Sequence, residues 1–155
     1  MTRSRRRCLT AVFIVAVLQH ACDASSPADL RLEELSSAVT FGSGAPASWA
    51  RDPVEILRGA VAGDTLTLEV RYGGGCAEHR FQVVGQGSFQ ESWPVGLALI
   101  LAHDAGDDPC DGLLQTTLRF DLTPVAERYR ASYGASSGIV RLHLEGLAHA
   151  LDYRF

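Results

Sequence analysis

The stretch TLTLEVRY at residues 65–72 alternates between polar and apolar side chains without a break. Leu66, Leu68, Val70 and Tyr72 share one face, and the polar residues between them share the other. Successive side chains of a strand point to opposite faces of a sheet, so the pattern predicts a strand with one buried face. This stretch therefore indicates a β-rich fold.

Similar two-residue periods recur along the chain. They lie at residues 79–84, 97–104, 114–122, 139–145 and 149–155, with weaker examples at 38–41, 54–58 and 89–93. About seven to nine short strands separated by Gly-rich or Asp-rich turns predict an all-β fold, a single antiparallel β-sandwich, with a barrel as second choice. One short helical turn is expected at residues 123–129, where Thr123 would be the cap and Pro124 the first helical residue.

The first 21 residues have the pattern of an export signal. Four arginines at positions 3, 5, 6 and 7 precede an apolar run at residues 9–18. The run is shorter than the roughly 20 apolar residues that a membrane-spanning helix needs. We therefore predict an export signal at residues 1–21, a polar tether at 22–29 and a single β-rich domain at 30–155.

Cys22 follows the apolar run and is the candidate lipidated residue. The sequence LQHAC at residues 18–22 resembles the lipobox of bacterial lipoproteins, although Gln19 stands where that motif usually has leucine. The expected consequence is a lipid anchor in a bilayer, with the domain facing the periplasm or the extracellular space. The alternative is a secreted protein cleaved nearby.

Removal of the signal makes the chain strongly acidic. The signal contains four of the fourteen basic residues and none of the eighteen acidic ones, so the net charge changes from −4 to −8. A negative surface repels phosphate backbones, which argues against nucleic acid as a partner. The expected partners are the bilayer, through the lipid, and an unidentified protein or small molecule.

Cys76 and Cys110 form the cysteine pair of the predicted domain. In an oxidising compartment such a pair predicts a disulfide. Closing a loop of about 35 residues would stabilise the fold by roughly 3 to 4 kcal/mol in the chain-entropy model. The alternative is a zinc or copper site in which Cys76, His79, His103 and Cys110 supply four ligands.

Strand periodicity also assigns faces to the histidines. His103 continues the row of leucines in 97–104, and His79 begins the row that includes Phe81, so both should point inward. His149 lies on the apolar face of 149–155 and is expected to be partly buried, whereas His143 should be solvated. The residues proposed for a pocket or a copper or zinc site are His79, His103, Asp104 and His149.

An acidic loop follows the strand at 97–104. Asp104, Asp107, Asp108 and Asp111 could supply oxygen ligands to calcium, but they lack the spacing of an EF-hand. The loop is therefore predicted to be a solvated turn. No set of residues in the sequence predicts a catalytic site, so an enzyme is the less favoured class.

One motif resembles a recurrent pattern in small, uncharacterised bacterial exported lipoproteins. It consists of Tyr72-Gly73-Gly74-Gly75-Cys76-x-x-His79-x-Phe81, followed by His103-Asp104 and Asp108-x-Cys110. The resemblance implies a β-rich exported domain with the two cysteines bonded, and it implies no particular activity. The predicted function is a disulfide-stapled binding or structural module of the cell envelope, with a periplasmic copper- or zinc-binding protein as the alternative.

Overall fold

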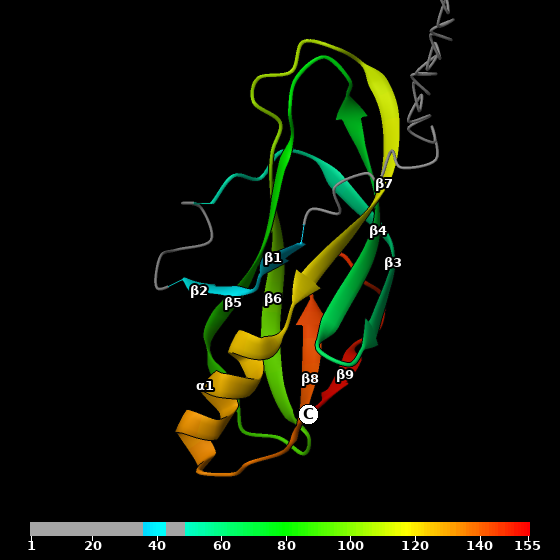
Figure 1. Ribbon diagram of the computed structural model, residues 1–155. Coiled ribbons are helices and arrows are strands. Elements are labelled where there is room, and N and C mark those ends of the chain that lie inside the picture. Colours follow the sequence, from blue (N-terminus) through cyan, green and yellow to red (C-terminus); the bar gives the residue numbers. More distant parts are fainter. Residues whose placement is uncertain (1–35, 43–48) are drawn as a thin grey trace, which may run out of the picture. The chain divides into compact units, whose positions relative to one another are not determined.

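The stretch TLTLEVRY forms β4 (Thr65–Gly74), a central strand in the computed structural model, which describes residues 36–42 and 49–155. β4 pairs antiparallel with β3 (Val54–Ala62) on one side and with β7 (Gly112–Asp121) on the other. β1 (Ser36–Ala38) completes this four-stranded sheet, in the order β1-β7-β4-β3 (Figure 1).

The second sheet has five strands in the order β2-β5-β6-β8-β9. Its members are β2 (Thr40–Gly42), β5 (Arg80–Gln90), β6 (Val95–Asp104), β8 (Ile139–Leu144) and β9 (Leu151–Arg154). The two sheets confirm the predicted β-sandwich, and the nine strands found in the described residues agree with the predicted number.

The strand directions differ in part from the antiparallel expectation. β1 runs parallel to β7, β2 runs parallel to β5, and β8 runs parallel to β6, so both sheets are mixed. Parallel neighbours need a crossover connection. Here the helix α1 carries the chain from β7 of the first sheet to β8 of the second, which single-strand periodicity could not predict.

The core lies between the sheets and is built from alternate residues of the central strands. In β4, the side chains of Leu66, Leu68 and Val70 are fully buried. The facing sheet contributes a matching row of buried side chains, namely Val83, Leu97, Leu99, Val140, Leu142 and Tyr153. The alternation of apolar residues noted in the sequence therefore matches the alternation of buried side chains along these strands.

The helix α1 (Thr123–Tyr133) is longer than the helical turn expected at 123–129. Its N-cap is Leu122 rather than Thr123, whose hydroxyl donates instead to Oδ1 of Asp121 at 2.6 Å. The helix ends at Gly134, whose left-handed backbone lets its N–H bond to the carbonyl of Arg130. Pro124 lies in the first turn as predicted.

Two of the predicted strand segments were wrong at their ends. Residues 91–94 form a turn between β5 and β6, so the weak strand expected at 89–93 is the end of β5 followed by that turn. The strand expected at 149–155 begins at Leu151, and His149 is exposed in the preceding segment. The expectation that His149 is partly buried was therefore wrong.

A continuous segment joins the outer edges of the two sheets. β1 and β2 are separated only by Val39, which is 2% exposed and donates its N–H to the carbonyl of Asp121 at 2.9 Å. The same short segment is therefore an edge strand of both layers. The predicted signal, the tether and Cys22 lie outside the described residues. Within residues 36–42 and 49–155, no helix is long and apolar enough to cross a bilayer.

Candidate functional site

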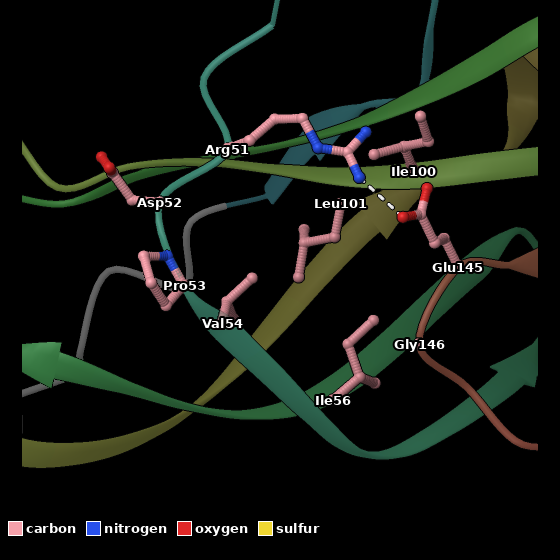
Figure 2. A pocket seen from close by; sticks show the side chains of 9 residues that line it. All are labelled: Arg51, Asp52, Pro53, Val54, Ile56, Ile100, Leu101, Glu145 and Gly146. Carbon is pink, nitrogen blue, oxygen red and sulfur yellow. Dashed lines mark hydrogen bonds and ion pairs between the residues drawn. The ribbon is translucent and has the colours of Figure 1, made fainter. Parts of the chain in front are cut away.

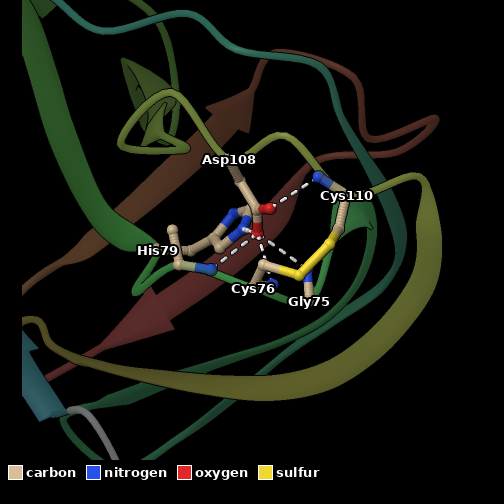
Figure 3. The surroundings of a disulfide bond; sticks show 6 residues. Gly75, Cys76, His79, Asp108 and Cys110 are labelled. Carbon is tan, nitrogen blue, oxygen red and sulfur yellow. Dashed lines mark hydrogen bonds and ion pairs between the residues drawn. A yellow bond between two sulfur atoms is a disulfide. The ribbon is translucent and has the colours of Figure 1, made fainter.

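Cys76 and Cys110 form a disulfide at one end of the first sheet (Figure 3). Their Cα atoms are 5.7 Å apart, and they are separated by 34 positions in the sequence. Each cysteine lies two residues from the last register pair of β4 and β7, which joins Gly74 to Gly112. The bonded state was predicted, and it engages both sulfur atoms that the four-ligand metal alternative would need.

The carboxylate of Asp108 lies beside this disulfide and accepts hydrogen bonds from backbone N–H groups on both sides of the S–S bond. Its Oδ2 atom accepts from Gly75 at 2.7 Å, Cys76 at 2.9 Å and Ala77 at 3.0 Å. Its Oδ1 atom accepts from Cys110 at 2.8 Å. These bonds, led by that from Cys110 and then that from Ala77, hold the pKa of Asp108 well below its usual value.

Asp108 corrects the prediction of a solvated acidic turn. Its side chain is only 1% exposed, whereas its neighbour Asp107 is exposed. The sequence carried one signal of this role, because an aspartate can accept the N–H of the residue two positions later in an Asx turn, as Asp108 does from Cys110. Its bonds to Gly75, Cys76 and Ala77 span more than thirty positions and have no local signal.

Because Gly74 has no side chain, His79 and Asp108 can pack directly against its backbone. A Cβ atom at this position would lie 2.4 Å from Nε2 of His79 and 2.8 Å from Oδ2 of Asp108. Its φ of 142° is also one that other residues rarely adopt. The glycine therefore serves both the turn and the close approach of two polar side chains.

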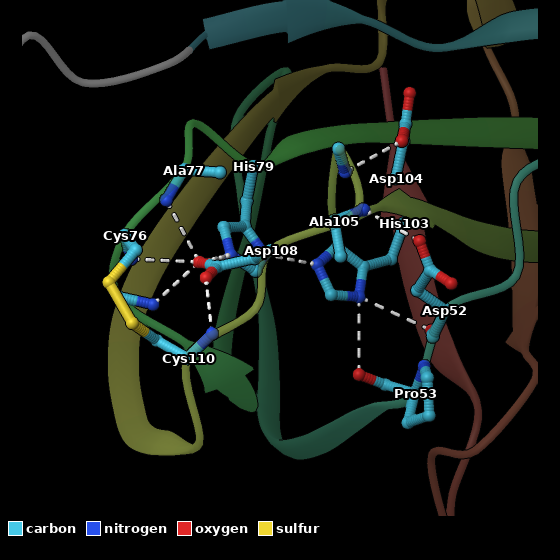
Figure 4. Close-up of polar contacts among 12 residues, drawn as sticks. Asp52, Pro53, Cys76, Ala77, His79, His103, Asp104, Ala105, Asp108 and Cys110 are labelled. Carbon is cyan, nitrogen blue, oxygen red and sulfur yellow. Dashed lines mark hydrogen bonds and ion pairs between the residues drawn. A yellow bond between two sulfur atoms is a disulfide. The ribbon is translucent and has the colours of Figure 1, made fainter.

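His79 and His103 continue from Asp108 as a chain of polar contacts (Figure 4). The Nε2 atom of His79 lies 3.1 Å from Oδ2 of Asp108, and its Nδ1 atom lies 2.8 Å from Nε2 of His103. The Nδ1 atom of His103 lies 3.2 Å from the carbonyl oxygen of Asp52 and 3.1 Å from that of Pro53. Every ring nitrogen of the pair therefore has a protein partner.

The two ends of this chain fix the direction of its outer hydrogen bonds. A carboxylate at one end and carbonyl oxygens at the other can only accept, so His79 Nε2 and His103 Nδ1 are the donors there. The contact between the rings joins the two remaining ring nitrogens.

Aromatic rings enclose the histidine pair. The ring of Phe81 stacks on His103 at a centroid distance of 4.5 Å and an interplanar angle of 1°. Tyr72 contacts His79 at 4.8 Å and His103 at 5.4 Å. His103 is 1% exposed, and this burial lowers its pKa. The inward direction predicted for both histidines is confirmed, since His79 is also buried.

The segment before β3 fixes the position of His103, at the end of the hydrogen-bonded chain that is remote from Asp108. Asp52 donates its N–H to the carbonyl of His103 at 3.0 Å, and His103 donates its own to Ala50 at 3.1 Å. The carboxylate of Asp52 accepts the N–H of Ala105 at 2.7 Å. Asp52 was not among the predicted site residues, because its role comes from a pairing between segments far apart in the sequence.

The remaining predicted site residues are not part of the polar contacts that run from Asp108 through the two histidines. Asp104 accepts the N–H of Gly106 at 3.0 Å within its own turn. His149 is exposed and lines a separate hollow with His143, which is exposed as predicted. The structure therefore brings together His79 and His103, and it adds Asp108 and Asp52 in place of Asp104 and His149.

Two hollows lie near this region of the molecule. One of about 230 Å³ is lined by Arg51, Asp52 and Ile56 among others, and is crossed by an ion pair of 2.6 Å between Arg51 and Glu145 (Figure 2). A larger one of about 430 Å³ has Trp49 and Phe81 in its lining, together with side chains of opposite charge.

Comparison with known proteins adds only distant structural similarity. No protein-family model matches the chain, and no curated protein matches it. A candidate toxin-related protein from Parabacteroides distasonis is 19% identical with a TM-score of 0.46, the match covering 77% of this chain and 59% of that one.

Two further solved structures show a similarly distant likeness to the chain. A NigD-like immunity protein from Bacteroides caccae is 16% identical with a TM-score of 0.48, over 75% of this chain and 58% of that one. A candidate lipoprotein from Bacteroides fragilis is 14% identical with a TM-score of 0.49, the match covering 77% of this chain and 68% of that one. The match thus spans about three fifths of the first two of these three proteins.

Proposed function

We propose that the chain is an exported, non-catalytic β-sandwich module of the bacterial cell envelope, held at the membrane by lipid on Cys22. The main support is the disulfide between Cys76 and Cys110, because such bonds form and persist in oxidising compartments. The basic and apolar pattern of residues 1–21 supports the same destination.

A non-catalytic role is supported by the way the titratable groups are used. A general base needs a nitrogen or oxygen within reach of a substrate proton. The four ring nitrogens of His79 and His103 lie within 3.2 Å of protein partners, and the His79 side chain is 4% exposed. These contacts favour a structural role for the pair over the copper- or zinc-binding alternative, which would have to break them.

A binding role is supported by the larger hollow. Its volume of about 430 Å³ falls within the usual range for small-molecule pockets. Trp49 and Phe81 offer aromatic surface there, and Arg80 and Asp104 offer opposite charges. An acidic protein with such a hollow suits a small partner that carries an apolar group and a polar one.

Membrane fractionation of the full chain in a Gram-negative host tests this proposal. We expect the protein in the membrane fraction, and we expect the Cys22→Ser variant to move to the soluble periplasmic fraction. Cys8→Ser is the matched control and should leave the distribution unchanged. Retention of both variants in the cytoplasm, or free thiols at Cys76 and Cys110 in the exported protein, would contradict the proposal.

A further inference from the structure

We propose that the protein binds a zinc ion between Cys76, Asp108 and Cys110 when its disulfide is reduced. The two sulfur atoms and a carboxylate oxygen of Asp108 lie within 4.8 Å of one another. Thiolates and carboxylates are both ligands of zinc, and modest side-chain movement would bring all three to one ion. This site uses Asp108 in place of the two histidines predicted from the sequence, and it does not depend on the proposed function.

The positions of the two cysteines do not rely on the S–S bond alone. β4 and β7 pair continuously up to Gly74 and Gly112, two residues from each cysteine. The carboxylate of Asp108 also accepts the backbone N–H of both cysteines. After the bond is cut, these contacts keep the two sulfur atoms at the same end of the sheet, so the dithiol is preorganised for one ion.

Asp108 has capacity for a cation on one of its two oxygens. Its Oδ2 atom contacts four residues, namely Gly75, Cys76, Ala77 and His79. Its Oδ1 atom accepts the N–H of Cys110. Two thiolates and this carboxylate would carry three negative charges around an ion of charge +2.

Reduction is chemically accessible because Cys76 is exposed. An external dithiol breaks the S–S bond, transfers two electrons and two protons to give two thiols, and is itself oxidised to a disulfide. Zinc then displaces both thiol protons to solvent as two Zn–S bonds form. Water completes the coordination. The soft thiolates favour zinc over calcium or magnesium, which prefer oxygen ligands.

The test is zinc binding by the reduced and the oxidised full chain, carrying Cys8→Ser and Cys22→Ser so that only Cys76 and Cys110 supply thiols. We expect one zinc per reduced chain by elemental analysis after desalting, and none for the oxidised chain. Cobalt in place of zinc should give thiolate-to-metal absorption in the reduced chain alone. Circular dichroism before metal addition should retain the native spectrum.

Variants and one chemical control separate this site from adventitious binding. Cys76→Ser and Cys110→Ser should each weaken zinc binding by more than about 100-fold, and Asp108→Asn by roughly 10- to 100-fold. Asp107→Asn is the matched control and should have no effect. Alkylation of the reduced chain should abolish binding without any substitution.

Three results would overturn the proposal. The first is a reduced chain that retains no more zinc than the oxidised one. The second is binding that survives loss of either thiol or is unchanged in Asp108→Asn. The third is loss of the native circular dichroism on reduction, because the site would then not be preorganised.

Discussion

The Nδ1 atom of His79 lies 2.8 Å from the Nε2 atom of His103, so a positive charge on His79 acts directly on the His103 ring. The same chain of contacts links Asp108 at one end to the carbonyls of Asp52 and Pro53 at the other.

The resistance of His103 to protonation predicts a loss of stability in mild acid. Burial, and next the neighbouring positive charge of His79, lower the His103 pKa from its ordinary 6.5, while its carbonyl partners act against this. The unfolded chain then binds more protons than the folded one, so stability falls as the pH drops below 6.5. Urea unfolding at pH 7, 6 and 5 should show this decline.

The matched variants for this experiment are His103→Gln and His143→Gln. His103→Gln should reduce the decline between pH 7 and pH 5, while His143→Gln, at an exposed position, should keep it. Equal slopes in all three proteins would contradict the assignment to His103.

Asp108 predicts a second acid transition at lower pH. Its pKa is held below the ordinary value of 3.8, so its contribution is present above that value and is lost as the pH falls below it. Asp108→Asn should be less stable than the wild type at pH 7, and the difference should shrink toward pH 2. Asp107→Asn should follow the wild type throughout. A constant difference at every pH would rule out the carboxylate as its source.

Loss of the disulfide should cost the same whichever cysteine is replaced. Cys76→Ser, Cys110→Ser and the double variant should each lose roughly 3 to 4 kcal/mol in the free energy of unfolding, because each removes the same bond. Denaturant melts without reductant measure this loss. A double variant that loses twice as much as either single one would show that the cysteines act separately.

Gly74 and Gly75 form a matched pair for testing the close approach at the site. Both have a positive φ, of 142° and 126°, so alanine at either should cost about 1 to 3 kcal/mol in backbone strain. Only at Gly74 would the new Cβ also meet His79 and Asp108. Thermal and urea unfolding should therefore show a clearly larger loss for Gly74→Ala. Equal losses would indicate that the polar side chains are not held against the backbone.

Tyr153 predicts a stability loss away from the site. It is fully buried, and its hydroxyl donates to Oδ1 of Asp64 at 2.6 Å. Tyr153→Phe should lose roughly 1.5 to 3 kcal/mol, as for a hydrogen bond to a charged group. Tyr133→Phe is the control, because its hydroxyl bonds to Glu91 on the surface, and it should change stability by less than about 0.5 kcal/mol. Comparable losses would contradict the buried bond.

The sequence predicted those features that depend on local alternation. Leu66, Leu68 and Val70 are buried because side-chain direction in a strand has a period of two. The same rule placed His79 and His103 inward. It failed for His149, since the strand there begins only at Leu151 and the preceding residues turn toward solvent.

The features that the sequence did not predict depend on contacts between distant segments. The parallel partners of β1, β2 and β8 follow from the order in which the chain visits the two sheets. Asp108 receives N–H groups from residues 75–77 only after β4 and β7 have paired. A charged residue in an acidic loop gives no sign that such donors will surround it.

The segment that contains β1 and β2 has a mechanical consequence. A pull applied to the chain before Ser36 loads the three register pairs of β1 with β7 first. If those pairs separate, the load passes through Val39 to β2 and its three pairs with β5 in the other sheet. The two short ladders would therefore separate in succession when the chain before Ser36 is pulled away from the sandwich.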